Sequence, residues 1–248
     1  MKNYTSYLNA FLDFSASPNQ EKIANTCFYS KIRYTKYSFF LILLSSFLAA
    51  LVTVLMEKSG VMPRFQNFAD SSVINKYGII GFYIISIIGA PVIEELAFRT
   101  LLVFSKINLT ISSGFLFYTL ACSFTGFRYS LSHPIAYYNI LGSCFCATLM
   151  WYYLSNKENY SKLNYLWKSH FPIVFYSSVL LFAYLHLFNF GEITIIKIIF
   201  SPFIVLQFFI CAIIFGHARI KLGLHWAIIL HMMLNGFVTL IQSLRTLA

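Results

Sequence analysis

The stretch IISIIGAPVIEELAFRTLLVF, residues 84–104, decides the fold of this chain. It is long enough to cross a membrane of about 30 Å as a helix rising about 1.5 Å per residue. It nevertheless contains Glu94, Glu95 and Arg99, and a charged side chain near the centre of a membrane helix costs about 2.5–3.5 kcal/mol on insertion scales. These three side chains must therefore face one another or a hydrated cavity, which requires further helices packed around them.

The composition of the rest of the chain supplies such helices. Hydrophobic residues make up 58% of the 248 residues and charged residues only 10%, whereas a soluble domain carries about 25% charged residues. This composition excludes a single soluble globule, and the 27 Phe and 17 Tyr residues exclude intrinsic disorder. The sequence therefore predicts an all-α fold, a polytopic transmembrane helix bundle.

Seven apolar segments are long enough to span the membrane, and they cover residues 37–56, 77–105, 109–127, 136–154, 171–190, 194–216 and 223–242. The second segment is too long for one straight helix, and Gly89 together with Pro91 predicts a kink or break in it. The polar N-terminal segment, residues 1–36, also carries aromatic side chains, which is typical of a short helix at the membrane surface. We therefore divide the chain into this interfacial segment and a transmembrane domain, residues 37–248.

The net charge of +10 reports orientation rather than a nucleic-acid ligand, because the Lys and Arg residues are scattered between apolar segments. If the N-terminus is cytoplasmic, the cytoplasmic loops hold Lys2, Lys22, Lys31, Arg33, Lys36, Lys106, Lys157, Lys162, Lys168, Arg219 and Lys221. The outer loops then hold only Lys58, Arg64, Lys76, Arg128, Lys197 and Arg245. Because cytoplasmic loops are enriched in Lys and Arg, we expect a cytoplasmic N-terminus, with membrane lipid and no nucleic acid among the partners.

The charged residues of the second segment differ in the partners they can reach. Glu95 and Arg99 are four residues apart, so they share a helix face and can form an ion pair. Glu94 points about 100° away around the helix, and an ion pair that only fixes helix packing would leave it unexplained. Two histidines lie in other apolar segments: His186 in LFAYLHLFN, residues 181–189, and His231 in IILHMMLN, residues 228–235.

These side chains suit the hydrolysis of a peptide bond inside a membrane. A glutamate in a poorly solvated site can accept a proton from water and later give it to a leaving amine. Histidine and asparagine side chains, such as His231 and Asn235 one helical turn apart, can donate hydrogen bonds to the oxyanion of a tetrahedral intermediate. Glutamate and histidine also bind zinc, so a zinc site of Glu94, His186 and His231 stays open, although the HExxH spacing is absent.

The same residues give a resemblance to a known family. EELAFR, residues 94–99, resembles the EExxxR motif of type II CAAX prenyl endopeptidases and their bacterial relatives, which include abortive-infection and bacteriocin self-immunity proteins. Phe182 and His186 match the FxxxH motif of that family, and His231 and Asn235 match its HxxxN motif, in the same order along the chain. The resemblance covers roughly residues 77–242.

The resemblance implies an intramembrane endopeptidase of a bacterial cell membrane, acting on a membrane-associated peptide or protein whose lipidation stays open. It implies that Glu94 activates the attacking water, that His186 positions this water, and that His231 and Asn235 form the oxyanion site. The two residues of the expected ion pair would support this geometry. The mechanism requires no cofactor, and zinc remains an open alternative.

The spacing of the first two motifs departs from the family. Glu94 and His186 are 92 positions apart, whereas the family more often separates these motifs by one helical hairpin. The additional residues form the segments 109–127 and 136–154, and because two extra spans are an even number, the motif helices keep their antiparallel sense. We expect this hairpin to contribute no catalytic group. His133 is the alternative histidine of the second motif, but Tyr129 stands where the motif has phenylalanine.

Three other functions are compatible with these residues. A non-catalytic membrane protein, such as a bacteriocin immunity protein that sequesters a toxin or a receptor, would keep the fold without needing Glu94. A proton-coupled transporter would use a set of glutamate and histidine side chains in the membrane, but no inverted repeat is visible. A bis-histidine haem protein is the third hypothesis. Nothing in the sequence identifies the peptide substrate.

Overall fold

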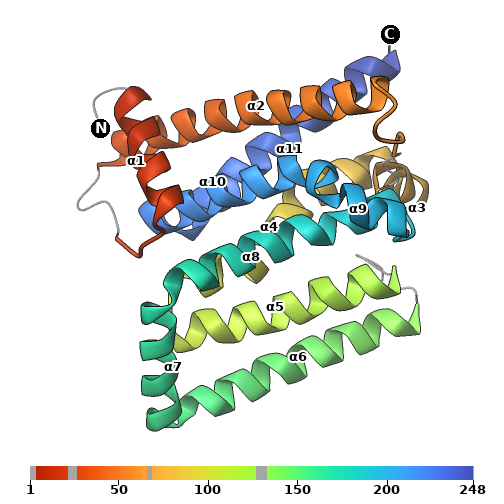
Figure 1. The fold of residues 1–248 in the computed structure, drawn as a ribbon. Helices are drawn as coiled ribbons and strands as arrows, with labels where there is room; N and C mark the ends of the chain where they lie inside the picture. Colours follow the sequence, from red (N-terminus) through yellow and green to blue (C-terminus); the bar gives the residue numbers. More distant parts are fainter. Residues whose placement is uncertain (1–3, 22–26, 66–68, 127–132, 248) are drawn as a thin grey trace.

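The computed structural model describes residues 4–21, 27–65, 69–126 and 133–247. Within these ranges the regular elements are helices and no strand occurs, which confirms the prediction of an all-α fold. Helices α2 (Phe28–Lys58), α5 (Lys106–Thr125), α8 (Phe171–Leu185) and α10 (Leu206–Leu222) run along one common direction of the bundle (Figure 1). The bundle therefore has two ends, at which these helices begin or finish.

Two short helices mark one end of the bundle. Helix α1 (Tyr4–Ala16) crosses the beginning of α2, and α7 (Lys157–Ser169) runs across the beginning of α8, both on the left of Figure 1. Helix α3 (Ala69–Ile84) and helix α9 (Ile195–Ile204) lie at the opposite end. We call these the α1/α7 end and the α3/α9 end.

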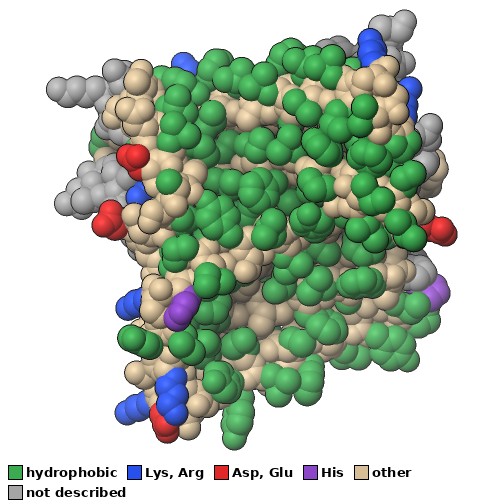
Figure 2. All heavy atoms as spheres, in the orientation of Figure 1, with side chains coloured by type: hydrophobic (Ala, Val, Ile, Leu, Met, Phe, Trp, Pro, Cys, Tyr) green, Lys and Arg blue, Asp and Glu red, His purple; other side chains and the backbone are tan. Residues whose placement is uncertain are grey.

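The surface between the two ends is apolar, as expected for a protein surrounded by lipid. Figure 2 shows hydrophobic side chains over the middle of the visible face and charged side chains mainly toward its ends. Large apolar side chains such as Phe47 and Ile195 are 65% and 79% exposed. Soluble monomeric proteins rarely expose apolar side chains over a whole face. This distribution supports the predicted polytopic membrane bundle.

The expected count of seven spans is not confirmed. Within the described residues, five helical segments are long and apolar enough to cross a membrane: Phe28–Lys58, Val73–Leu102, Lys106–Thr125, Phe171–Phe190 and Leu224–Gln242. The pair of α9 and α10, bent by 46°, makes a sixth if it counts as one span. Helix α6 (Pro134–Ser155), from the expected segment 136–154, is absent from this set although it has 22 residues. Its many Tyr and Trp residues are only partly apolar, because each carries a polar group.

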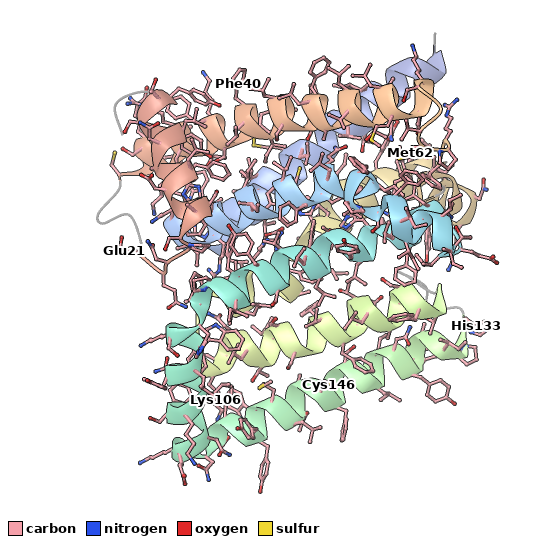
Figure 3. All side chains as sticks on the ribbon, in the orientation of Figure 1. Glu21, Phe40, Met62, Lys106, His133 and Cys146 are labelled. Atoms are coloured by element: carbon pink, nitrogen blue, oxygen red, sulfur yellow. The ribbon has the colours of Figure 1, made fainter. Side chains whose placement is uncertain are left out.

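The extra hairpin nevertheless forms as an antiparallel pair. Lys106 Nζ, at the beginning of α5, donates to Ser155 Oγ at the end of α6 over 2.8 Å. At the other end, Asn139 Nδ2 donates to Thr125 Oγ1 over 3.1 Å. Figure 3 shows Lys106 and His133 at opposite ends of this hairpin. Both termini of the hairpin therefore lie at the α1/α7 end, as an even number of passes requires.

The predicted break in the second segment is a π-helix, η1 (Ile85–Gly89), followed by α4 (Ala90–Phe98). The Ala90 N–H donates to the Ile85 carbonyl, five residues back instead of four. A second irregularity lies at Gly78, whose φ of 69° is a left-handed conformation that glycine adopts without strain. The sequence analysis did not predict this second break.

Helix α1 contacts the bundle through its aromatic side chains. Tyr7, Phe11 and Phe14 share one helix face and are buried, and the Tyr7 hydroxyl lies 3.0 Å from Ser38 Oγ on α2. Beneath them, the Tyr34 hydroxyl lies 2.8 Å from Nε2 of His217 on α10. The aromatic face of α1 is therefore buried against protein, and its place at the membrane surface stays a prediction.

We predict that Gly114→Leu destabilises the protein by opening the hairpin. A Cβ at Gly114 would lie 3.2 Å from Ala147 Cβ and 3.2 Å from the Ser143 carbonyl oxygen on α6, and such overpacking costs about 1–3 kcal/mol. Thermal unfolding in detergent should show a lower midpoint. Thr148→Leu, at an exposed position of α6, is the matched control and should leave the midpoint unchanged. An equal midpoint for both variants would contradict close packing at Gly114.

Candidate active site

Helix α4, which carries the first motif, is fixed in the bundle by its last turn. The final carbonyl groups of a helix lack partners within the helix, and here side chains of three other helices supply them. Ser112 Oγ of α5 donates to the Ala97 carbonyl over 2.5 Å, and Ser178 Oγ of α8 donates to the Phe98 carbonyl over 2.9 Å. Arg219 Nε of α10 donates to the Arg99 carbonyl over 2.9 Å. The position of α4 is therefore set from several sides.

The expected ion pair between Glu95 and Arg99 is present and inaccessible to solvent. Arg99 Nε lies 3.4 Å from Glu95 Oε2, and both side chains are 0% exposed. The guanidinium nitrogens make no directed hydrogen bond with the described residues. Instead, Arg99 Cζ lies 4.7 Å from the centre of the Phe182 ring and 5.9 Å from that of Phe215. Attraction between a cation and aromatic faces strengthens in such a desolvated site.

His231, on α11 (Leu224–Leu247), connects the two glutamates of the first motif. Its Nδ1 lies 3.1 Å from Glu95 Oε1, and its Nε2 lies 3.8 Å from Glu94 Oε2. Glu95 also pairs with Arg99, and a carboxylate in such an ion pair accepts hydrogen bonds, so His231 Nδ1 carries the proton that it donates. The ring stacks on Phe215 with 4.5 Å between the ring centres. His231 is therefore fixed in both tautomer and orientation.

His186 reaches Glu94 from the other side. It follows the last residue of α8 and begins the 3-10 helix η3 (His186–Phe190), and its Nδ1 lies 2.8 Å from the Phe182 carbonyl. A carbonyl oxygen only accepts, so Nδ1 carries the proton and Nε2 presents a lone pair in the neutral ring. This Nε2 lies 4.0 Å from Glu94 Oε2. The separation is too long for a direct hydrogen bond and suits one bridging water.

Asn235 is held by the irregular backbone of η1. In the π-helical register the Ser86 carbonyl would accept from residue 91, but Pro91 has no N–H. The Asn235 Nδ2 group donates to this carbonyl over 2.8 Å. A primary amide has two hydrogens, so one of them is used to bind η1 and the second is left for the cavity. The sequence analysis missed this contact because its acceptor is a backbone atom.

One cavity of about 620 Å³ brings the four expected catalytic residues together: Glu94, His186, His231 and Asn235 all line it. The Glu94 side chain is 15% exposed and that of His186 16% exposed, so water can reach them. His133, the alternative histidine, is exposed at the beginning of α6 and does not line the cavity. The geometry thus selects His186 over His133 as the neighbour of Glu94.

The described residues contain no group of three His, Cys, Asp or Glu side chains with the arrangement of a metal site. Glu94, His186 and His231 come nearest to one in composition. Ligands around a tetrahedral zinc ion at about 2.0–2.1 Å would be separated by about 3.4 Å, whereas the two histidine nitrogens lie 4.0 and 3.8 Å from Glu94 Oε2. These distances leave room for one hydrogen-bonded water between the three groups.

We predict that Arg99→Ala destabilises the fold far more than Glu94→Gln. The first change leaves the buried Glu95 carboxylate without its cation, and breaking a buried pair in this way costs about 3–5 kcal/mol. The second change keeps the shape of a side chain that borders the cavity. Thermal unfolding in detergent would compare the two variants with the wild type. Equal midpoints would show that the ion pair does not stabilise the bundle.

Comparison with known proteins identifies the family. Residues 76–237 match the family described as type II CAAX prenyl endopeptidase Rce1-like. This range contains all three motifs and covers more than half of the chain. No curated protein and no solved structure matches the chain. The chain therefore belongs to the type II CAAX prenyl endopeptidase Rce1-like family.

Proposed function

We propose that this membrane protein is an endopeptidase in which Glu94 activates a water molecule to attack a peptide bond. One observation carries the proposal: Glu94 Oε2 lies 4.0 Å from His186 Nε2 and 3.8 Å from His231 Nε2, within a single cavity inside an otherwise apolar bundle. Ionisable side chains inside a membrane bundle cost free energy, so a cluster of them indicates a functional site. Membership of a protease family supports the same conclusion.

The hydrogen-bonding state of His186 determines how the water would be held. Because His186 Nδ1 donates to the Phe182 carbonyl, its Nε2 accepts, as does the Glu94 carboxylate. A water between them directs one hydrogen to each, which leaves an oxygen lone pair for the substrate carbonyl. As the new C–O bond forms, Glu94 takes the proton of the water. It then gives this proton to the amine nitrogen as the C–N bond breaks.

His231 and Asn235 would stabilise the oxyanion that forms in this step. His231 can donate from Nε2 only as an imidazolium, because its Nδ1 proton is already bonded to Glu95. The His231 ring is held on Glu95, which in turn pairs with Arg99. The second amide hydrogen of Asn235 would add another donor. Glu95 and Arg99 thus act as positioning residues rather than as contacts to the substrate.

The substrate class follows from the family and the surroundings of the site. We propose a membrane-associated peptide or protein, with a prenylated cysteine near its carboxyl end as the first chemistry to test. We also propose that the protein lies in a bacterial cell membrane with its N-terminus in the cytoplasm, as the charge distribution favours. Neither zinc nor another cofactor enters this mechanism.

We predict that Glu94→Gln abolishes hydrolysis, because glutamine keeps the shape of the side chain and cannot accept the proton. The assay uses purified protein in liposomes and a quenched fluorescent peptide with a farnesylated cysteine followed by three residues, beside its unprenylated form. Glu158→Gln is the matched control, since Glu158 is on α7 and its side chain is 72% exposed. It should retain the wild-type rate.

The outcomes separate an enzyme from a binding protein of the same fold. Cleavage by the wild type that is lost in Glu94→Gln and survives a zinc chelator supports the proposed mechanism. Wild-type turnover by Glu94→Gln would refute the role of Glu94. An immunity protein that only sequesters a partner would cleave neither peptide and would protect cells equally well with either residue at position 94.

A further inference from the structure

The cavity around Glu94 reaches the surface at one end of the bundle. Its exposed lining residues are Lys76 of α3, Gly126 after α5, Gly191 after η3 and Val238 of α11. The first three lie at the α3/α9 end, where α3 begins, α5 ends and η3 ends. Among the described residues that line the cavity, none belongs to α1 or α7. The mouth of the cavity is therefore at the α3/α9 end.

The opposite end of the bundle is closed by packed aromatic side chains. Phe98 at the end of α4, Phe171 and Phe175 of α8, and Phe14 of α1 form one buried cluster. Phe14 and Phe175 are in edge-to-face contact with 5.2 Å between their ring centres. None of these four side chains lines the cavity around Glu94. Among the described residues, the cavity therefore does not extend to the α1/α7 end.

The two ends also differ in basic charge. The α1/α7 end carries nine described Lys and Arg residues on or beside its helix termini, namely Lys31, Arg33, Lys36, Lys106, Lys157, Lys162, Lys168, Arg219 and Lys221. The α3/α9 end carries four with described side chains, namely Lys58, Arg64, Lys76 and Lys197. Basic residues accumulate on the cytoplasmic side of membrane proteins. The asymmetry places the α1/α7 end in the cytoplasm.

Helix α7 strengthens this assignment. It has no buried residue, and Tyr165 and Leu166 are 72% and 51% exposed. Three lysines accompany these apolar and aromatic side chains, a combination typical of a helix lying on an anionic membrane surface. Anionic lipids enrich the cytoplasmic leaflet of cell membranes.

We infer that the substrate reaches Glu94 from the outer side of the membrane, so that this protease cuts peptide segments exposed outside the cytoplasm. That a peptide substrate uses this route rests on the proposed hydrolase function, whereas the side of the membrane on which the cavity opens does not depend on it. Along α11, His231 and Gln242 both line the cavity and are about 16 Å apart at 1.5 Å per residue. An extended peptide advances about 3.3 Å per residue, so about five residues fit along this length of the cavity.

Thiol labelling of single cysteines tests the sidedness directly. Lys76→Cys at the mouth and Lys162→Cys on α7 are a matched pair of exposed lysines at opposite ends. Both are made in the full chain with the exposed Cys27 and Cys144 replaced by serine, and this parent protein measures background labelling. A charged, membrane-impermeant thiosulfonate is applied to intact cells and to permeabilised cells.

We expect Lys76→Cys to be labelled in intact cells and Lys162→Cys only after permeabilisation. The reverse pattern, or labelling of both positions in intact cells, overturns the inference. Because labelling requires no turnover, its failure leaves the hydrolase proposal intact. Conversely, wild-type turnover by Glu94→Gln would refute the hydrolase mechanism and leave the labelling result unchanged.

A second measurement connects the mouth to catalysis. In sealed liposomes sorted for one orientation, a bulky thiol reagent on Lys76→Cys should slow peptide hydrolysis when reagent and peptide are added to the mouth side. The same reagent on Lys162→Cys should not. Each variant is compared with its own unmodified form. Equal inhibition at both positions would show that the mouth at Lys76 is not the route of the substrate.

Discussion

The buried carboxylate of Glu95 is the group on which the arrangement of the other helices depends. A buried charge is tolerated only when it is paired, and Glu95 finds Arg99 on its own helix and His231 on α11. Arg99 in turn lies between Phe182 of α8 and Phe215 of α10. One carboxylate thereby ties four helices together, which explains why a motif needs two adjacent glutamates. Glu95 pairs with Arg99 and His231, whereas Glu94 lines the cavity and is accessible to water.

The irregular helix before the motif has a matching physical cause. The π-helix η1 and the missing N–H of Pro91 together free the Ser86 carbonyl, and an unsatisfied carbonyl in an apolar bundle costs free energy. Asn235 removes that cost with one amide hydrogen. The hydrogen bond thus joins α11, which carries His231, to the span that carries Glu94, close to the candidate site. The π-helix η1 therefore contributes both to helix packing and to the geometry of the candidate site.

Much of this arrangement could be predicted from the sequence because polar residues in apolar segments are conspicuous. Glu94, His186, His231 and Asn235 were predicted to share one cavity for that reason. The aromatic partners of Arg99 were not predicted, because Phe182 was noted only for the FxxxH motif and nothing distinguishes Phe215 among 27 phenylalanines until Arg99 is placed between the two rings. The buried face of α1 escaped prediction because the same spacing of aromatic residues suits lipid and protein equally. The count of seven spans is not confirmed, because α6, with four tyrosines and one tryptophan, has intermediate polarity.

The extra hairpin shows how a change outside the motifs alters the site without altering its chemistry. Only α5 of the pair lines the cavity, through Cys122 and Ser123, while α6 covers the other side of α5. Ser112 of α5 also caps the end of α4, so the hairpin is built into the support of the first motif. The proposed catalytic groups come from α4, α8 with η3, and α11, and α5 adds a wall of the cavity. Under the proposed function, the substrate would touch this wall, which belongs to the hairpin by which the chain departs from the expected family spacing, and α5 is where we expect selectivity to be determined.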